Sequence, residues 1–290
     1  MSVGFVGLGN MGQGMADNLL EKGADLTVFT RTPSKIEAMI DRGATGASSV
    51  ADITRKVDVV LVCLPDVKTS RDLLLGEDGV FATCRPGQIV VDHSTVDIAT
   101  SRACAESAEV KGAHFLDAPI SGGPSGAADG TLSIMVGGNV DAFETAHEFF
   151  SKMGANVKLM GPSGAGTAMK LINQLLVGVH TVAAAEAFAL ANSAGVDIQT
   201  AADLLAVSWG GSTMVDRSAP ITAAREFPDS AAPVRNLDKD LGIIRSLAAD
   251  EGLSLEMSLK SQEMFQHMMS QGKNEYDISG VLEVIEERSR

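Results

Sequence analysis

The chain begins with a short apolar segment that runs directly into a glycine-rich loop. The segment "VGFVG" contains Gly7, which with Gly9 and Gly12 has the spacing G-x-G-x-x-G, and the helix-forming run "MGQGMADNLLEKG" follows. In this strand–turn–helix order the first glycine permits a tight turn, the second admits a pyrophosphate and the third lets the helix pack on the strand. The pattern alone also fits a tight turn, but its context predicts a dinucleotide site at a helix N-terminus.

Beyond this loop the first half of the chain alternates apolar runs with amphipathic stretches. The runs "DLTVF", "DVVLVCLP", "QIVVDHST" and "HFLDAP" have the length and composition of strands. Such alternation predicts an α/β fold whose parallel sheet has helical crossovers. From about residue 163 the pattern is helical. We therefore predict a Rossmann-type doubly wound sheet in residues 1–162 and an all-α domain in residues 163–290.

The second part is expected to be built on one long helix. The run "AMKLINQLLVGVHTVAAAEAFALANSAG" contains no proline, and residues 167–194 would form about 40 Å of helix. It is too apolar on all sides for a surface helix, so we expect it to be the central helix of its domain. The small residues around Ala184 would let another helix approach closely, within the domain or across a dimer.

Charge and cysteine content exclude several classes of protein. The formal charge is −14 and the basic residues are scattered, which argues against nucleic-acid binding. The three cysteines include no C-x-x-C pair, so neither a disulfide framework nor a metal site is expected. The N-terminus has no targeting signal, and no apolar window of about 18 uninterrupted residues follows. We expect a cytoplasmic protein that does not contact a membrane.

The end of the second predicted strand bears on the choice of cofactor. It reads "FTRTPSK", with Thr30, Arg31 and Thr32 where an NAD-binding protein would carry an acidic residue for the ribose hydroxyl, and with Lys35 nearby. Arg31 can pair with a 2′-phosphate and stack on the adenine. The alternative is a surface arginine in a loop. The local chemistry favours NADP, with NAD also possible.

Two later loops have a composition that suits ligand binding. "DHSTV" places Ser94 and Thr95 at the carboxyl end of a strand, and "DAPISGGPSG" places Ser121, Gly122 and Gly123 in succession. Ligands collect at this edge of an open α/β sheet, and a Ser-Gly-Gly loop can offer a hydroxyl and successive backbone N–H groups to a small carboxylate. Each loop could equally be a turn or a helix cap.

Lys170 is the only ionisable residue of "AGTAMKLINQLLVG". By helical spacing it shares a face with Asn173 and Gln174. Burial lowers the pKa of a lysine and suits it to exchange protons near neutral pH. The residues alone leave open whether Lys170 is a catalyst or extends to water.

Four segments together resemble the β-hydroxyacid dehydrogenase family over essentially the whole chain. They are, in order, "GFVGLGNMGQGMADNLL", "FLDAPISGGPSGAADGTLSIMVGG", "GAGTAMKLINQLL" and "NLDKDLGI". The resemblance implies that Lys170 is the catalytic lysine and that Asn173 assists it. It also implies that the Ser121 loop holds the substrate carboxylate, that Thr95 lies by the nicotinamide and that Lys239 reaches the cleft from the second domain.

The resemblance implies hydride transfer between a nicotinamide, which Arg31 favours as that of NADP(H), and a small 3-hydroxy acid or its semialdehyde. It also implies a homodimer or homotetramer, with residues 163–290 as the domain for substrate binding and dimerisation. The long helix and the end "DISGVLEVIE" are most similar to the L-threonate dehydrogenase branch, which often has an acidic residue in place of Arg31. An NAD-dependent L-threonate-type enzyme is therefore an alternative. A non-catalytic dinucleotide-binding module is another, although Lys170 argues against it.

The predicted site has three parts. The cofactor-binding residues are Gly7, Leu8, Gly9, Asn10, Met11, Gly12, Thr30, Arg31, Thr32, Leu64, Pro65, Thr95 and Lys239. The catalytic residues are Lys170 and Asn173, and the substrate-binding residues are Ser121, Gly122, Gly123 and Gln174.

Overall fold

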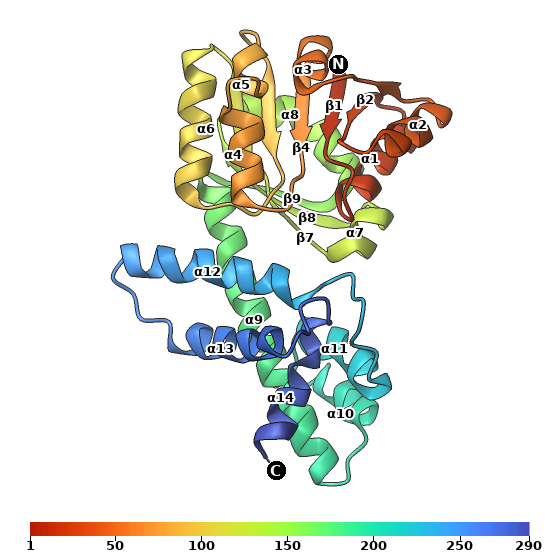
Figure 1. Ribbon diagram of the computed structural model, residues 1–290, viewed down its shortest axis with the longest axis vertical. Coiled ribbons are helices and arrows are strands. Elements are labelled where there is room, and N and C mark those ends of the chain that lie inside the picture. Colours follow the sequence, from red (N-terminus) through yellow and green to blue (C-terminus); the bar gives the residue numbers. More distant parts are fainter. Residues whose placement is uncertain (290) are drawn as a thin grey trace. The chain divides into compact units, whose positions relative to one another are not determined.

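A computed structural model describes residues 1–289 of the chain (Figure 1). The chain divides into two compact units, Met1–Lys170 and Leu171–Arg290. The division falls inside the long helix α9 (Ala165–Ser193), whereas the sequence predicts a boundary before it, between residues 162 and 163. The first turns of α9 are bonded to the sheet of the first unit, as described below.

The first unit is built on a nine-stranded sheet. Its strands are β1 (Ser2–Val6), β2 (Asp25–Phe29), β3 (Thr45–Gly46), β4 (Val59–Val62), β5 (Ile89–Asp92), β6 (His114–Asp117), β7 (Ile120–Ser121), β8 (Leu132–Gly138) and β9 (Gly154–Gly161). They lie in the order β3-β2-β1-β4-β5-β6-β8-β7, with β9 also paired to β8. All pairs from β3 to β6 are parallel, so the predicted Rossmann-type arrangement is confirmed.

Beyond β6 the sheet is mixed, whereas the five strands expected from the sequence, β1, β2, β4, β5 and β6, are all parallel. Strand β8 runs antiparallel to both β6 and β7, while β9 is parallel to β8. The reason is the length of one connection. Strands β6 and β7 run in the same direction, and the chain reverses only between β7 and β8, through the ten residues 122–131. A parallel pair needs a crossover of a dozen or more residues, which this link does not provide.

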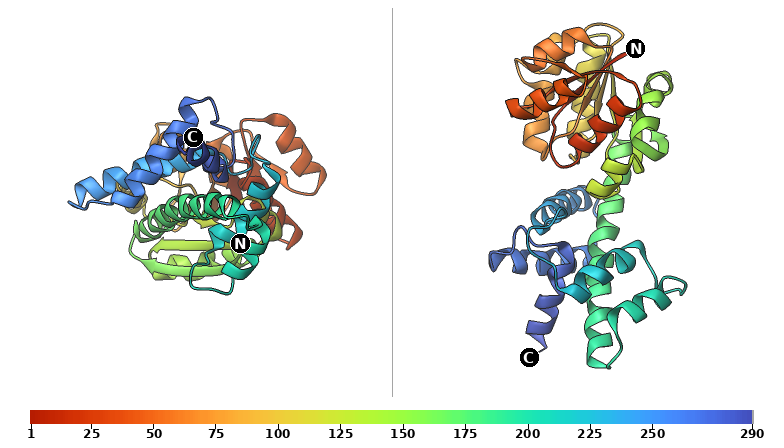
Figure 2. Two further views of the ribbon diagram at one scale, coloured as in Figure 1. Left: turned by 90° about the horizontal axis from the view of Figure 1, so that it is seen from below. Right: turned by 90° about the vertical axis from the view of Figure 1, so that its right-hand side faces the viewer.

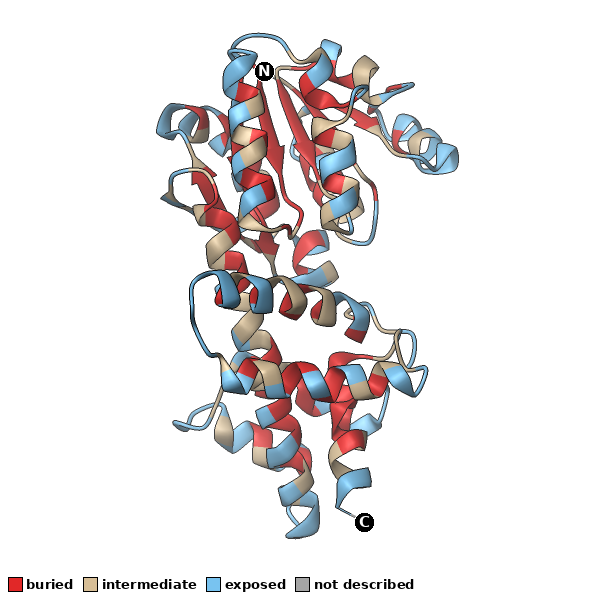
Figure 3. Cartoon of the chain, turned by 60° about the vertical axis from the view of Figure 1, so that its left-hand side comes forward, coloured by how far each residue is buried: buried red, intermediate tan, exposed pale blue. Residues whose placement is uncertain are grey.

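Helices cover both faces of the sheet. They are α1 (Gly12–Glu21), α2 (Pro33–Asp41), α3 (Val50–Lys56), α4 (Val67–Leu75), α5 (Val80–Thr83), α6 (Ile98–Val110), α7 (Gly123–Asp129) and α8 (Val140–Met153). One apolar core joins the sheet to α1 and α8 through side chains such as Met15 and Phe150, and the other joins it to α3–α6 through Leu74 and Cys104. Figure 3 shows the resulting pattern, with buried strands between helices whose outer faces are exposed.

In the second unit, the elements of the described residues 171–289 are all helices. After α9 it contains α10 (Ile198–Leu205), α11 (Thr213–Ala224), α12 (Val234–Asp250), α13 (Glu256–Ser270), the 3-10 helix η1 (Ile278–Gly280) and α14 (Val281–Arg288). In Figure 2 the other helices of this unit are arranged along α9. Phe188 of α9 lies at 0% exposure in a core with Ile198 and Val215. The predicted all-α architecture on a long helix is confirmed.

One face of α9 differs from expectation. The sequence predicts burial on every side, yet Ile172, Leu176 and Leu190 are 54%, 46% and 71% exposed. These residues recur at helical spacing, so together they form one exposed apolar face of α9. By length and composition α9 could also cross a membrane, but the central helices of soluble proteins pass the same test.

Candidate active site

The glycine-rich loop joins β1 to α1 in a conformation that requires two of its glycines. Gly7 has φ +99°, and a Cβ there would lie 2.3 Å from the carbonyl oxygen of Cys63. A Cβ on Gly12 would lie 1.9 Å from the carbonyl oxygen of Gly7. Both distances are far below van der Waals contact, so only glycine fits at the turn and at the helix start.

The same loop is open where a ligand would approach. A Cβ built on Gly9 has no neighbour within 4 Å, and both Gly9 and Asn10 are exposed. Helix α1 begins without a side-chain cap and without an acidic residue in its first turn. Gln13 N donates to the Gly9 carbonyl oxygen at 3.0 Å, and the positive end of the helix dipole is open to an anion, so the loop fits the diphosphate of a dinucleotide.

The remaining residues of the loop contribute differently. The Leu8 side chain is 1% exposed and packs in the core, so only its backbone can serve the site. Its carbonyl oxygen accepts a hydrogen bond from Lys35 Nζ at 2.6 Å. The ammonium of Lys35 thus lies beside the glycine-rich loop. In the sequence, the only indication of this contact is that Lys35 follows shortly after Arg31, in the run that the cofactor is expected to contact.

The predicted cofactor-selecting residues follow the end of β2. Arg31 and Thr32 are exposed and Thr30 is half-buried. Thr32 is the N-cap residue of α2, but its side chain makes no capping hydrogen bond. Residues 30–35 contain no carboxylate, so the only charged groups of this turn are the cations Arg31 and Lys35.

The loops after β4 and β5 are tied together. The backbone N–H of Leu64 donates to Ser94 Oγ at 2.8 Å, and Ser94 is buried. Ser94 therefore joins two loops rather than facing a ligand. Its neighbour Thr95 is half-buried and Pro65 is exposed, so Leu64, Pro65 and Thr95 lie on connected loops at the carboxyl end of the sheet.

Two titratable groups at the end of β5 are buried. Asp92 accepts a hydrogen bond from Ser94 N at 2.9 Å, and burial raises the pKa of Asp92 to about 6. His93 Nδ1 lies 2.7 Å from the carbonyl oxygen of Ala118, and its ring packs edge-on against Phe150. Burial lowers the pKa of His93 to about 4, so its imidazole is neutral at pH 7. His93 belongs to the core and not to the site.

The raised pKa of Asp92 predicts how stability depends on pH. Its carboxyl binds a proton more tightly in the folded than in the unfolded chain, so its contribution to the free energy of unfolding decreases as pH rises from about 4 to 6. An asparagine at this position would stay neutral and could still accept from Ser94 N. We compare the free energy of unfolding in urea of Asp92→Asn with that of the wild type. We expect this difference to shift in favour of the variant by about 2–3 kcal/mol from pH 4 to pH 7.5. A difference between the two proteins that does not change with pH would contradict this.

Asp117, at the end of β6, binds the start of α9, and the sequence reasoning missed it. Its Oδ1 accepts from Gly164 N at 2.7 Å and its Oδ2 from Thr167 N at 2.8 Å. Burial raises the pKa of Asp117, and these two bonds oppose that rise. A carboxylate at a helix N-terminus also interacts favourably with the helix dipole. The sequence feature that could have indicated this role is an aspartate at the last position of a buried strand.

Glycines permit the close contact between α9 and the sheet. A Cβ on Gly166 would lie 2.2 Å from the carbonyl oxygen of Met135 and 2.5 Å from that of Asp117. Gly164 has φ +93°. The hydroxyls of Thr167 and Ser101 add a buried hydrogen bond of 2.8 Å. The first turn of α9 is therefore bonded to the first unit through backbone and side chains.

Lys170 lies one turn beyond this attachment. It is 7% exposed, so its side chain does not extend into water. It is also the last residue of the first unit. A buried lysine held on a rigid helix suits proton exchange, because its position and its solvation are both set by the fold.

The later predicted residues form a polar network in the second unit. Asn173 Nδ2 donates to Gln174 Oε1 at 3.1 Å, and Gln174 Nε2 donates to Asp240 Oδ2 at 2.5 Å. Lys239 Nζ lies 2.9 Å from Asp240 Oδ1. Asp240 is 5% exposed, so it connects α9 to α12 from a buried position. The sequence alone does not show that Gln174 bonds to Asp240.

The Ser-Gly-Gly loop follows β7. Gly122 has φ +135° and Gly123 has φ +65°, conformations that favour glycine. Both are exposed, and Ser121 is half-buried. No side-chain cap binds the N–H groups at the start of α7. The loop can thus present a hydroxyl and backbone donors to a small anion. Among residues 1–289, no group of three or more His, Cys, Asp or Glu could hold a metal.

Both units match known families. Residues 2–161 match the NAD binding domain of 6-phosphogluconate dehydrogenase, and residues 164–285 match the domain described as NAD-binding of NADP-dependent 3-hydroxyisobutyrate dehydrogenase. An NAD-dependent L-serine dehydrogenase of Pseudomonas aeruginosa is 34% identical, over 96% of both chains. The mitochondrial 3-hydroxyisobutyrate dehydrogenase of Homo sapiens is 32% identical, over 98% of this chain and 87% of its own.

Solved structures agree with this result. The 3-hydroxyisobutyrate dehydrogenase of Salmonella typhimurium has a TM-score of 0.88 and 30% identity, covering 98% of this chain and 99% of its own. Psf3 in complex with NADP+ and 2-OPP has a TM-score of 0.89 and 27% identity, with the same coverage. A Rossmann-type sheet with an open glycine-rich loop, together with these matches, defines an oxidoreductase that uses a nicotinamide dinucleotide. The chain belongs to the β-hydroxyacid dehydrogenase family, and its activity is that of a hydroxyacid dehydrogenase.

Proposed function

We propose that the protein is an NADP(H)-dependent oxidoreductase that interconverts a small 3-hydroxy acid and its semialdehyde, with Lys170 as general acid and base. The observation that carries the proposal is the burial of Lys170 one turn beyond the Asp117 attachment, since α9 has no other ionisable residue near this end. The bound nicotinamide supplies the hydride acceptor in oxidation and the hydride donor in reduction.

The protein's own residues bind and orient the acid and move its proton. The Ser121 hydroxyl and the N–H groups of Gly122 and Gly123 bind the carboxylate, which orients the hydroxyl-bearing carbon. Lys170 Nζ takes the proton from the substrate hydroxyl oxygen during oxidation and returns it during reduction. Asn173, one turn further along α9, assists Lys170. This division of roles agrees with the small hydroxy acids for which the relatives are named.

The preference for NADP rests on the turn after β2. Arg31 is exposed there, Lys35 lies against the Leu8 carbonyl, and residues 30–35 contain no carboxylate. A 2′-phosphate would gain a charge-assisted pair with Arg31, whereas the ribose hydroxyl of NAD would find no acidic acceptor. The relatives do not decide the matter, because one is NAD-dependent and another binds NADP+.

Initial rates test the proposal. We expect turnover with one or more of 3-hydroxyisobutyrate, L-serine, L-threonate and 3-hydroxypropionate, each assayed with NADP and with NAD, and a higher kcat/KM with NADP. Arg31→Ala should lower kcat/KM with NADP by about 10- to 100-fold, the equivalent of about 1.4–3 kcal/mol, and change it little with NAD. Arg55→Ala, an arginine elsewhere on the surface, serves as the matched control. A preference for NAD of more than about tenfold would contradict the role of Arg31.

A further inference from the structure

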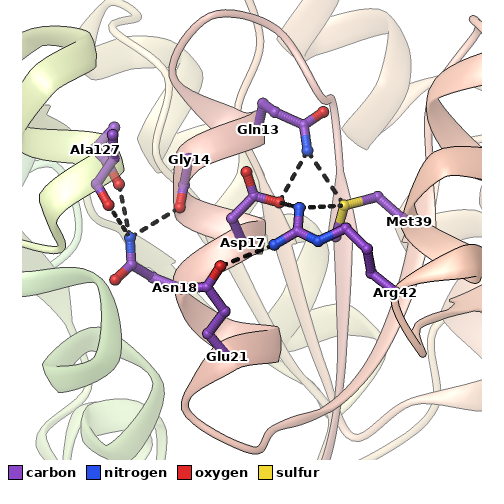
Figure 4. Close-up of polar contacts among 9 residues, drawn as sticks. Gln13, Gly14, Asp17, Asn18, Glu21, Met39, Arg42 and Ala127 are labelled. Atoms are coloured by element: carbon purple, nitrogen blue, oxygen red, sulfur yellow. Dashed lines mark hydrogen bonds and ion pairs between the residues drawn. The ribbon is translucent and has the colours of Figure 1, made fainter.

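A buried amide joins two helices of the first unit. Asn18 of α1 is 5% exposed. Its Nδ2 lies 2.9 Å from the carbonyl oxygens of both Ala127 and Ala128 in α7, and 3.0 Å from that of Gly14 in its own helix (Figure 4). We call the group formed by Gly14, Asn18, Ala127 and Ala128 the α1–α7 clamp.

The clamp supplies what α7 lacks on its own. A helix of seven residues is too short to be stable in isolation, and its last carbonyl groups have no partner within the helix. The Asn18 amide donates to two of those carbonyls. Gly14 allows the contact, because a Cβ there would lie 2.8 Å from the backbone of Ala127 and Ala128. The position of α7 therefore depends on α1.

The two helices begin at the two loops of the proposed site. Helix α1 starts at Gly12, at the end of the glycine-rich loop, and α7 starts at Gly123, at the end of the Ser121 loop. We propose that Asn18 is a positioning residue for the reaction: through the clamp it sets the Ser121 loop, and hence the substrate carboxylate, at a fixed place relative to the dinucleotide loop. The inference rests on the proposed role of the Ser121 loop.

The variant Asn18→Asp tests this role, because it keeps the shape of the side chain and removes its donors. A carboxylate would face two carbonyl oxygens at about the distance of the present bonds, and α7 would be displaced. We expect the KM for 3-hydroxyisobutyrate, at saturating NADPH or NADP, to rise about tenfold or more and kcat/KM to fall by about 10- to 100-fold. The Kd of NADPH, titrated without substrate, should change by less than about twofold.

A matched control lies on the same helix. Asp17 bonds to Gln13 Nε2 at 3.0 Å and pairs with Arg42, on the side of α1 that faces α2 (Figure 4). Asp17→Asn makes the reverse exchange, from carboxylate to amide, at the neighbouring residue and leaves the bonds to α7 in place, so KM should stay within about twofold of the wild type. If Asn18→Asp does not fold, Asn18→Ala replaces it, since alanine leaves the carbonyls unpaired without repelling them.

Two further measurements separate the clamp from the proposed function. Hydrogen exchange of residues 121–130 needs no turnover, and their amides should exchange faster in Asn18→Asp than in Asp17→Asn. Ser121→Ala should raise KM by itself. In the double variant with Asn18→Asp, the rise in KM should be smaller than the product of the two single rises. A raised KM in Ser121→Ala with an unchanged KM and exchange in Asn18→Asp would overturn the clamp alone. An unchanged KM in Ser121→Ala, with faster exchange in Asn18→Asp, would overturn the carboxylate site and with it the positioning role.

Discussion

Lys170→Ala is expected to lower kcat by about 10²- to 10⁴-fold, because the proposed proton exchange with the substrate hydroxyl would lose its acid and base. The KM should change much less, since the carboxylate is held by the Ser121 loop. The measurement is steady-state turnover in both directions with the best hydroxy acid, together with the circular dichroism spectrum and unfolding midpoint of the variant. Lys170→Met, which keeps the length of the side chain but not its charge, should be equally impaired.

The control for Lys170 is a lysine without a role in the site. Lys56 lies on the surface of α3, where it pairs with Asp52 at 2.9 Å. Lys56→Ala should keep wild-type turnover, because exposed pairs of this kind contribute little to stability. Near-normal turnover in a folded Lys170→Ala protein would show that the proton is moved by another group.

Asp117→Ala is expected to have the second large effect, on stability as well as on turnover. The change leaves the N–H groups of Gly164 and Thr167 buried without their acceptors. Each unsatisfied donor costs about 1–3 kcal/mol, so we expect a loss of about 2–5 kcal/mol in the free energy of unfolding. Because Lys170 lies one turn from Thr167, kcat should also fall by about tenfold or more, since small displacements of a reacting group are costly.

A different helix cap provides the comparison. Asp197 caps α10 by accepting from Thr200 N at 2.8 Å, so Asp197→Ala removes a carboxylate of the same kind at the start of another helix. It should cost much less stability than Asp117→Ala and leave kcat unchanged. The free energy of unfolding in urea and kcat are measured for both Asp117→Ala and Asp197→Ala. If Asp117→Ala loses stability but keeps full kcat at a temperature where it is folded, Asp117 does not contribute to turnover.

Local patterns account for the parts of the site that lie on a single loop. The G-x-G-x-x-G spacing predicts the turn at Gly7 and the helix start at Gly12, because a tight turn and a close helix contact impose glycine at fixed positions. Consecutive glycines at Gly122 and Gly123 likewise indicate a loop with unusual backbone angles. The strand and helix periods predict the Rossmann-type unit and the helical unit, since each period determines which side chains can face a core.

Contacts between distant segments required the tertiary structure. The bond from Asp117 to the start of α9, the bonds from Asn18 to α7 and the contact of His93 with Ala118 join residues that are 25 to 110 positions apart. No local period encodes such pairs. The exposed apolar face of α9 was mispredicted for the same reason, and the antiparallel direction of β8 was not predicted, because the neighbours of a helix or strand depend on the path of the whole chain.

The sequence by itself thus determined the class of fold, the dinucleotide loop and the identity of Lys170 as the one ionisable residue near the start of the long helix. The tertiary structure decided that Lys170 is buried and that its helix is bonded to the sheet through Asp117. It also decided that the two binding loops are linked through Asn18. The physical reason is that glycine turns and periodicities are set by neighbours along the chain, whereas burial and hydrogen-bond partners are set by segments that meet only on folding.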